Sequence, residues 1–245
     1  MTEQRAGHFV VLRPGQLHRD GQRLCDYREA LACMASLAAR HPDAGDVLIS
    51  VQHPPTITVG RRGAHGMIHA RSLDLPGRPP LHVDVHEVPR GGSVTWHAPG
   101  QLVVYPVLRL TRLARPLGRP PLGDLPAYAR ALERAMEATC TAFGLATRGR
   151  PGFAGLWLDE RRKIASLGVA IQSGWTTHGI ALNVCPHLAG FDLITPCGLD
   201  GVEMTSLWRE LDELGLPRPP LETVEARLLD ELAARLTLGV DGELA

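Results

Sequence analysis

The chain has 245 residues, of which 44% are hydrophobic and 21% charged, a balance typical of a folded globular protein rather than a disordered one. Lysine plus arginine and aspartate plus glutamate each number 26, so the formal net charge is zero. A neutral chain has no long-range field that would draw it to DNA or to an anionic membrane. We therefore expect no nucleic-acid partner and no membrane partner.

The cysteines are spread along the chain without a Cys-x-x-Cys pair, at Cys25, Cys33, Cys140, Cys185 and Cys197. An odd number without that spacing predicts neither a disulfide framework nor a zinc knuckle, so we expect the reduced thiols of a cytoplasmic protein. The first residues lack a basic stretch followed by an apolar run, and no run approaches the length of a membrane span. Secretion and membrane insertion are therefore not expected.

The predicted elements of the first half are mostly strands. A short strand is expected over 8–12, and apolar residues three or four positions apart predict an amphipathic helix over 24–40. β-branched runs predict strands over 46–52 and 56–59, a loop rich in arginine and glycine follows, and alternating polarity predicts a strand over 81–86. Two strands joined through glycine-bearing turns are expected between 90 and 108.

The second half combines strands with three helices. A surface connection over 109–123 leads to a helix that Asp124 caps and Gly144 ends. A hairpin over 153–158 and 163–172, a strand over 176–184 and helices over 205–214 and 221–236 follow. Strands outnumber helices in a mixed order, so we expect an α/β fold with a mixed, mostly antiparallel sheet flanked by helices. We expect one domain over 1–245, with a helical C-terminal end at 203–240.

Cys197 is a candidate nucleophile. It lies in Thr195-Pro196-Cys197-Gly198, where proline and glycine impose a tight turn. A thiol on such a turn lies near backbone amides and is accessible, and both conditions favour a reactive thiolate. Cys185, before a proline at a strand end, is a weaker rival, and the alternative is that each cysteine is an inert packing residue.

Lys163 is a candidate base, because it is the single lysine of a chain whose other basic residues are arginine. Arginine replaces lysine in most surface roles but cannot lose its proton. Lys163 begins a predicted buried strand, and desolvation at such a place favours a neutral amine. The alternatives are chance retention and a solvated charge at a hairpin tip, and position alone favours the hairpin tip.

The stretch Arg90–Gln101 is a candidate ligand-binding loop, because its paired glycines allow close backbone approach and Arg90, Thr95 and His97 offer polar contacts. Alone, the pattern also fits an ordinary bulge or turn.

Histidine spacing raises a metal site as a further alternative. His65 and His69 are four positions apart but lie in a glycine-rich loop, and His82 and His86 share a strand face without an obvious third ligand. We therefore predict no metal site.

Four ordered motifs together resemble the octanoyltransferases of lipoate biosynthesis, the lipoyl(octanoyl) transferase (LipB) family. The resemblance covers about 47–207, and Trp96 stands where tyrosine is commoner in that family. The motifs are Arg90-Gly91-Gly92-x-x-Thr95-Trp96-His97-x-Pro99-Gly100-Gln101, Lys163-Ile164-Ala165-Ser166-Leu167-Gly168, His178-Gly179-Ile180-Ala181-Leu182-Asn183 and Pro196-Cys197-Gly198.

The resemblance implies a catalytic domain with the fold of biotin protein ligases and lipoate ligases, and we expect a monomer. It implies transfer of an octanoyl group from acyl carrier protein to a lysine of lipoyl domains, in 2-oxoacid dehydrogenase complexes and the glycine cleavage H protein. Cys197 would hold the acyl group as a thioester, Lys163 would move protons, and no cofactor is required. The implied acyl-binding positions are Arg90, Gly91, Gly92, Ser93, Val94, Thr95, Trp96, His97, Ser166, Leu167, Gly168, Gly179, Ile180 and Ala181.

Three other functions remain open. An ATP-dependent lipoate or biotin ligase of the same fold needs the lysine but no nucleophilic cysteine. A binding protein would keep the pocket without catalysis, and a thiol hydrolase would use Cys197 with His97 or His178 to release free octanoate. The arginine-rich segments around Arg61 and over Arg112–Arg119 either dock an acidic carrier protein or face water.

Overall fold

The computed structural model describes the complete residues 9–16, 23–39, 46–63, 66–74, 77, 79–109, 125–196 and 201–236, and the backbone alone of residues 2–6, 17, 237 and 238. Its helices are α1 (Tyr27–Ala38), α2 (Leu125–Ala142), the 3₁₀ helix η2 (Leu188–Leu193), α3 (Leu207–Glu213) and α4 (Leu221–Leu238). The strands before α2 are β1 (Thr2–Ala6), β2 (Phe9–Arg13), β3 (Gln16–Leu17), β4 (Arg23–Leu24), β5 (Val47–Val51), β6 (Thr56–Val59), β7 (Ser72–Leu73), β8 (Leu81–His82), β9 (Asp84–Glu87), β10 (Val94–His97) and β11 (Gln101–Val107). The strands after it are β12 (Arg148–Arg150), β13 (Phe153–Trp157), β14 (Arg162–Gln172), β15 (Trp175–Asn183) and β16 (Glu203–Met204).

A large sheet runs through the middle of the described chain. Its strand order is β1-β2-β5-β11-β15-β14-β13-β12, and β16 pairs with β14. Neighbouring strands are antiparallel except for β2 with β5 and β14 with β16. The prediction of an α/β fold with a mixed, mostly antiparallel sheet flanked by helices is therefore confirmed.

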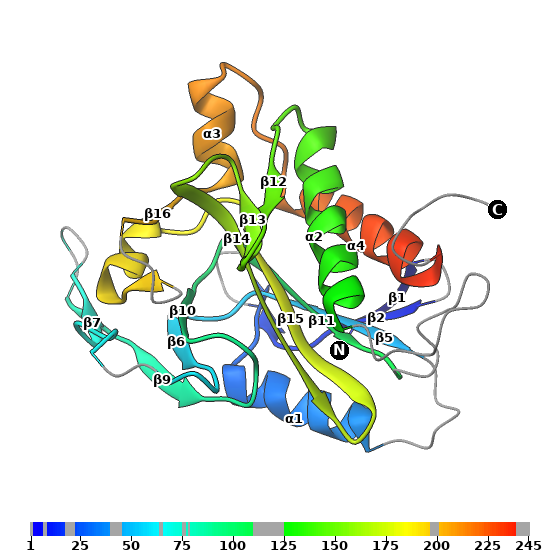
Figure 1. Cartoon of the computed structure of the whole chain (residues 1–245). Helices are drawn as coiled ribbons and strands as arrows, with labels where there is room; N and C mark the ends of the chain where they lie inside the picture. The colour runs from blue at the N-terminus through cyan, green and yellow to red at the C-terminus, as the bar shows by residue number, and fades with distance from the viewer. Residues whose placement is uncertain are drawn as a thin grey trace.

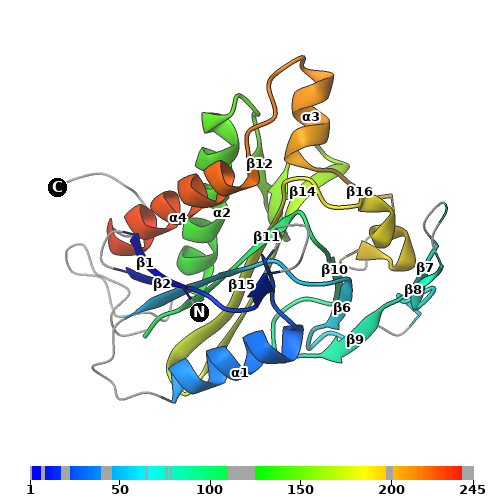
Figure 2. The same ribbon diagram turned by 180° about the vertical axis from the view of Figure 1, so that it is seen from behind.

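Helices cover both faces of the large sheet (Figures 1 and 2). Because side chains of a strand alternate between faces, Leu48 and Val104 pack with α2 and α4, whereas Ile49 and Val103 pack with α1. All four side chains are at most 1% exposed, so each face contributes a separate apolar core. These two cores fix α1 and α2 on opposite sides of the central strands.

A small sheet stands beside the large one, in the order β10-β6-β9. Pro54 and Pro55 separate β5 of the large sheet from β6 of the small sheet, and the turn before Gln101 returns the chain from β10 to β11. A third apolar core joins the small sheet to η2 through Ile57, Trp96 and Phe191. The chain therefore passes between the two sheets at two neighbouring places.

Three predicted elements differ from the structure at positions where particular hydrogen bonds give the reason. Leu24 and Cys25 precede the first helix, because Leu24 pairs in β4, the Cys25 amide donates to the Gln52 carbonyl and the Asp26 side chain caps α1. The expected strand over 81–86 divides at Val83, whose amide donates to the Arg71 carbonyl, so β8 and β9 join different sheets. Residues 205 and 206 precede α3, which the Ser206 side chain caps.

Several expectations concern residues outside the described part of the chain: His8, the end of the first helix at 40–42, the connection over 110–123 and the cap at Asp124. Within the described part, no helix combines the length and the apolar character needed to cross a membrane.

Candidate active site

A cavity of about 610 Å³ lies between the two sheets, with walls from α1, β10, β11, α2, β13, β14 and β15. The structure brings almost all of the predicted acyl-binding positions together here, although they lie in three separate stretches of sequence. Those lining the cavity are Arg90, Gly91, Gly92, Ser93, Val94, Thr95, His97, Ser166, Leu167, Gly168, Gly179, Ile180 and Ala181, together with the candidate base Lys163.

Trp96 is the exception among the predicted positions. It is fully buried but faces the core of the small sheet, because strand alternation sends it away from Thr95 and His97. A Cβ added at Gly190 would lie 2.1 to 2.5 Å from atoms of the indole ring, so the ring packs directly on the backbone of η2. Trp96 thus shapes the small sheet rather than the cavity surface.

Lys163 is 1% exposed, which excludes the solvated hairpin-tip position that the sequence alone favoured. It is the second residue of β14, and its Nζ donates a hydrogen bond of 2.8 Å to the Ala154 carbonyl. The amine also lies 5.0 Å from the centre of the Trp157 ring, within the range of a cation–π contact. The amine is therefore held by β13 at the wall of the cavity.

Cys197 lies outside the described residues, and the structure places the chain on either side of it. On one side, the Thr195 amide donates to the Met67 carbonyl over 2.9 Å. On the other side, β16 runs parallel to β14, with Met204 opposite Lys163, and the Thr205 amide donates to the Lys163 carbonyl over 2.9 Å. The segment that follows Cys197 is therefore tied to the strand that carries Lys163.

The other four cysteines do not line the cavity. Cys25 and Cys140 are buried, and desolvation raises the pKa of each thiol to about 12. Cys185, the rival nucleophile, is half-buried just after β15, and burial raises its pKa as well. A raised pKa disfavours the thiolate that a nucleophile needs.

A chain of buried side chains joins the cavity to the segment after Cys197. His97 Nδ1 donates to Gln101 Oε1 over 2.7 Å, Gln101 Nε2 donates to Asn183 Oδ1 over 2.8 Å, and Asn183 Nδ2 donates to the Thr205 carbonyl over 2.9 Å. Gln101 and Asn183 stand in the quoted motifs, but no role was predicted for them because their hydrogen-bond partners are distant in the chain. They connect β11, β15 and the residues beside Lys163.

The two cavity histidines are uncharged at neutral pH. Burial lowers the pKa of His178 to about 4, with a further contribution from Arg90, and burial lowers the pKa of His97 well below its usual value. His178 also has a backbone φ of 57°, which is uncommon outside glycine, and its Nδ1 lies 3.4 Å from the Tyr27 hydroxyl. The cavity wall therefore contributes polar but neutral imidazoles.

Arg90 holds the glycine loop against the sheet. Its guanidinium donates to the Thr58 carbonyl over 2.8 Å and to the Gly91 carbonyl over 2.9 Å, and the Gly91 amide donates to the Val169 carbonyl. A Cβ at Gly168 would lie 3.0 Å from the Arg90 side chain, so this close packing depends on glycine. Arg90 thus shapes the cavity wall through the backbone around it.

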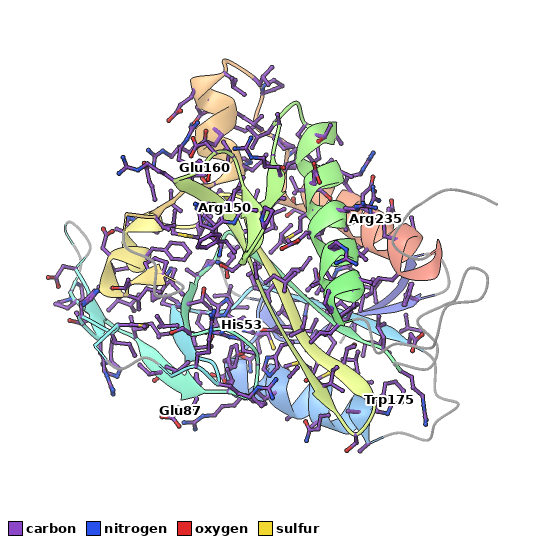
Figure 3. The ribbon with its side chains drawn as sticks, viewed as in Figure 1. His53, Glu87, Arg150, Glu160, Trp175 and Arg235 are labelled. Carbon is purple, nitrogen blue, oxygen red and sulfur yellow. The ribbon has the colours of Figure 1, made fainter. Side chains whose placement is uncertain are left out.

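Some cavity residues carry no sequence signal. Tyr27, Tyr105 and three residues of the first turns of α2, Leu125, Pro126 and Ala129, line the cavity but look like ordinary core positions in the sequence. Figure 3 shows His53 among the packed side chains at the centre of the molecule, where it bonds the Tyr105 hydroxyl over 2.7 Å. Only tertiary packing places these groups at the site.

The histidine pairs weighed as metal ligands lead to no metal centre in the described residues. No group of three or more histidine, cysteine, aspartate or glutamate side chains gathers there in a way that could hold a metal ion. His65 itself lies outside the described residues.

The chain is similar to known proteins in both sequence and fold. The family model described as the lipoyl protein ligase A/B catalytic domain matches residues 26–233. A protein named octanoyltransferase from Desulfovibrio desulfuricans is 37% identical over 206 residues, covering 84% of this chain and 81% of the relative. A second, from Acidobacterium capsulatum, is 40% identical over 205 residues, covering 81% of each chain.

The fold is similar to that of a solved putative lipoate protein ligase from T. acidophilum with bound lipoic acid. The TM-score is 0.56 at 15% sequence identity, and the match covers 94% of this chain and 85% of that one. The family model and the sequence relatives both span most of the chain, and residues of three of the quoted motifs line the cavity. The chain belongs to the lipoyl protein ligase A/B catalytic domain family.

Proposed function

We propose that the protein is an octanoyltransferase that moves an octanoyl group from the thioester of acyl carrier protein to the ε-amine of a lysine on a lipoyl domain. The observation that carries this proposal is the buried Lys163 amine in the wall of a cavity built from the family's motifs. The names of the sequence relatives support the octanoyl group as the cargo.

The proposed reaction has two displacements. In the first, the Cys197 sulfur attacks the thioester carbonyl of the donor, a new thioester forms, and the carrier thiol leaves. Lys163 takes the proton of the Cys197 thiol and returns a proton to the departing carrier thiolate. Splitting the transfer in this way replaces one difficult step by two easier ones.

In the second displacement, the ε-amine of the lipoyl-domain lysine attacks the Cys197 thioester. An amide bond forms, the Cys197 sulfur leaves and regains a proton, and Lys163 removes the proton that the attacking amine loses. A thioester is exchanged for a thioester and then for an amide, so the reaction needs neither ATP nor a metal or other cofactor. A base held in position contributes about 10² to 10⁴ in rate.

The cavity is the proposed acyl site. Its walls combine apolar groups of β11, β14 and β15 with the glycine loop, and the acyl-binding positions implied by the family motifs line it, Trp96 excepted. We place the single catalytic domain over 1–245 and propose that it acts as a monomer in the cytoplasm. Its acceptors are the lipoyl domains of 2-oxoacid dehydrogenase complexes and the glycine cleavage H protein.

Intact-protein mass spectrometry tests the proposal directly. The wild-type chain and Cys197→Ala are incubated with octanoyl-acyl carrier protein without ATP. We expect one octanoyl adduct on the wild type, removed by hydroxylamine, and none on Cys197→Ala. A folded wild-type protein that forms no adduct would contradict the cysteine thioester.

Two added reactions separate the alternatives. A ligase would modify the lipoyl domain only when ATP and the free acid are supplied, and the likeness to a lipoate ligase fold makes that reaction worth running. A hydrolase would release octanoate at the same rate whether or not the lipoyl domain is present. The proposed transferase gives an octanoylated lipoyl domain from the carrier-bound donor alone.

A further inference from the structure

One peptide group, between Ala154 and Gly155, joins Lys163 to a carboxylate on α2. The Ala154 carbonyl accepts a hydrogen bond of 2.8 Å from Lys163 Nζ. The Gly155 amide, at the other end of the same peptide group, donates a hydrogen bond of 2.9 Å to Oε1 of Glu133. The carboxylate, the peptide and the amine therefore form one continuous hydrogen-bonded line.

The backbone of β13 is shaped for this arrangement. Gly155 has a φ of 110°, a conformation that favours glycine, and a Cβ there would lie 2.2 Å from the Ala165 carbonyl oxygen and 3.0 Å from Lys163 Cε. Only glycine allows the peptide to come so close to the lysine side chain. The sequence thus places its most compact residue where β13 meets Lys163.

Glu133 is near the cavity but outside it. Lys163 and Ala154 line the cavity, as does Ala129, which lies one helical turn before Glu133 on the same face of α2. Glu133 is half-buried and does not line the cavity, so it has no contact with a bound acyl group. Any effect of Glu133 on the reaction has to pass through Lys163.

We propose that Glu133 is a positioning residue for Lys163, whose amine it holds and orients through the Ala154–Gly155 peptide group. A carboxylate that accepts the amide N–H polarises the peptide and makes its carbonyl oxygen a stronger acceptor. That carbonyl then binds the charged amine more strongly than the neutral one. The inference rests on the proposed proton-carrying role of Lys163 in the transfer reaction.

The charged groups around Glu133 are consistent with this direction. Burial raises the pKa of its carboxyl group, while the Gly155 amide, Lys163 and Arg130 act in the opposite sense and Glu137 adds to the rise. β13 presents no charged side chain, and the two arginines of β12 pair with Glu160. The peptide, the lysine behind it and Arg130 of the same helix thus act in favour of the charged carboxylate.

The test uses the fact that Lys163 is the single lysine of the chain. A tag-free protein grown with ¹³C-labelled lysine gives one side-chain ¹³Cε signal, which is followed as a function of pH without any acyl donor. In Glu133→Gln the amide keeps the shape and an acceptor oxygen but loses the charge, so the fold is preserved. Because the variant lacks the negative charge behind the peptide group, we expect the midpoint of the Lys163 titration to lie at lower pH than in wild type.

Glu137→Gln is the matched control, because Glu137 lies one turn further along α2 and bears the same charge. We expect the midpoint of the Lys163 titration in Glu137→Gln to match that of wild type. An unchanged midpoint in Glu133→Gln, or an equal change in Glu137→Gln, would overturn the inference.

A kinetic measurement supplies a second readout. The acid limb of the pH profile for octanoyl transfer should move in the same direction in Glu133→Gln and stay in place in Glu137→Gln. The titration requires no turnover, so its result stands even if no acyl-enzyme forms. Absence of the acyl-enzyme would remove the proposed function, whereas an unmoved lysine titration would remove only the role of Glu133.

Discussion

Lys163 is useful as a proton carrier only if its side chain can release a proton, which a guanidinium group does not do in proteins. We therefore expect Lys163→Arg to lose octanoyl transfer by about 10² to 10⁴-fold while the chain still folds. Single-turnover formation of the acyl-enzyme measures the first quantity, and thermal unfolding measures the second. Full activity in Lys163→Arg would exclude the proton-carrying role.

The buried histidines make stability depend on pH. Burial lowers the pKa of both His53 and His178 to about 4, whereas an unfolded histidine titrates near pH 6.5. Between these values the unfolded chain binds more protons than the folded one, so stability falls as pH decreases from about 6.5 toward 4. Each buried histidine should contribute a loss of about 1 kcal/mol between pH 7 and pH 5.5.

Urea unfolding of the wild type and two variants at those two pH values checks this expectation. His53→Gln removes one buried imidazole and should reduce the loss of stability by about 1 kcal/mol. His82→Gln, at an exposed position on β8, should leave the loss unchanged. A wild-type protein equally stable at both values would contradict the assignment of neutral buried imidazoles.

Where β10 meets η2, the Trp96 ring packs on the backbone of Gly190, which has no side chain. Because a Cβ at Gly190 would lie within 2.5 Å of the Trp96 ring, Gly190→Ala must push the two elements apart. We expect a loss of about 1 to 3 kcal/mol in the free energy of unfolding, the usual cost of overpacking a core.

A double-mutant cycle with Trp96→Tyr checks the cause. The smaller ring leaves room for the added methyl group, so Gly190→Ala should cost clearly less in the Trp96→Tyr background, as measured by denaturant unfolding. If the two changes were additive, the ring would not be the group that Gly190 accommodates. Acyl-enzyme formation should persist in Trp96→Tyr, because Trp96 faces away from the cavity.

Across the whole molecule, some elements could be predicted from local sequence patterns, whereas others depend on contacts between distant parts of the chain. Local patterns were sufficient for the central strands, which stand out as β-branched and apolar runs, and for α2 and α4, whose helical periodicity marks a face that packs in a core. The alternating polarity over 81–86 failed at Val83, where one backbone hydrogen bond to Arg71 divides an apparently regular strand between two sheets. Such a bond depends on a partner that no local pattern reveals.

The residues of the candidate site also fall into two groups, those that sequence motifs reveal and those that only tertiary packing brings to the cavity. The motif residues were found because they stand in contiguous runs, whereas Tyr27, Tyr105 and the first turns of α2 reach the cavity only through packing. Position alone made Lys163 an exposed hairpin charge, and the structure buries it because β13 and β16 lie on either side of the start of β14. Glu133 is beyond sequence reasoning altogether, since its link to Lys163 runs through a peptide group of another strand.

Although the chain as a whole carries no net charge, the mouth of the cavity is locally positive. Arg61 and Arg62 are exposed, line the cavity and are fixed by backbone hydrogen bonds to the loop that begins at Arg90. An acidic carrier protein that delivers its acyl group there would meet both guanidinium groups. Two exposed ion pairs of this kind together amount to about a tenfold change in affinity.

We therefore expect the double variant Arg61→Ala, Arg62→Ala to raise KM for octanoyl-acyl carrier protein by about tenfold with little change in kcat. Because exposed charges are screened by salt, the KM of the wild type should rise with ionic strength more steeply than that of the variant. Steady-state rates at low and high salt measure both effects. Arg227→Ala, on α4 and outside the cavity lining, is the control and should behave as wild type. Equal KM values and equal salt dependence in all three proteins would show that the two arginines only face water.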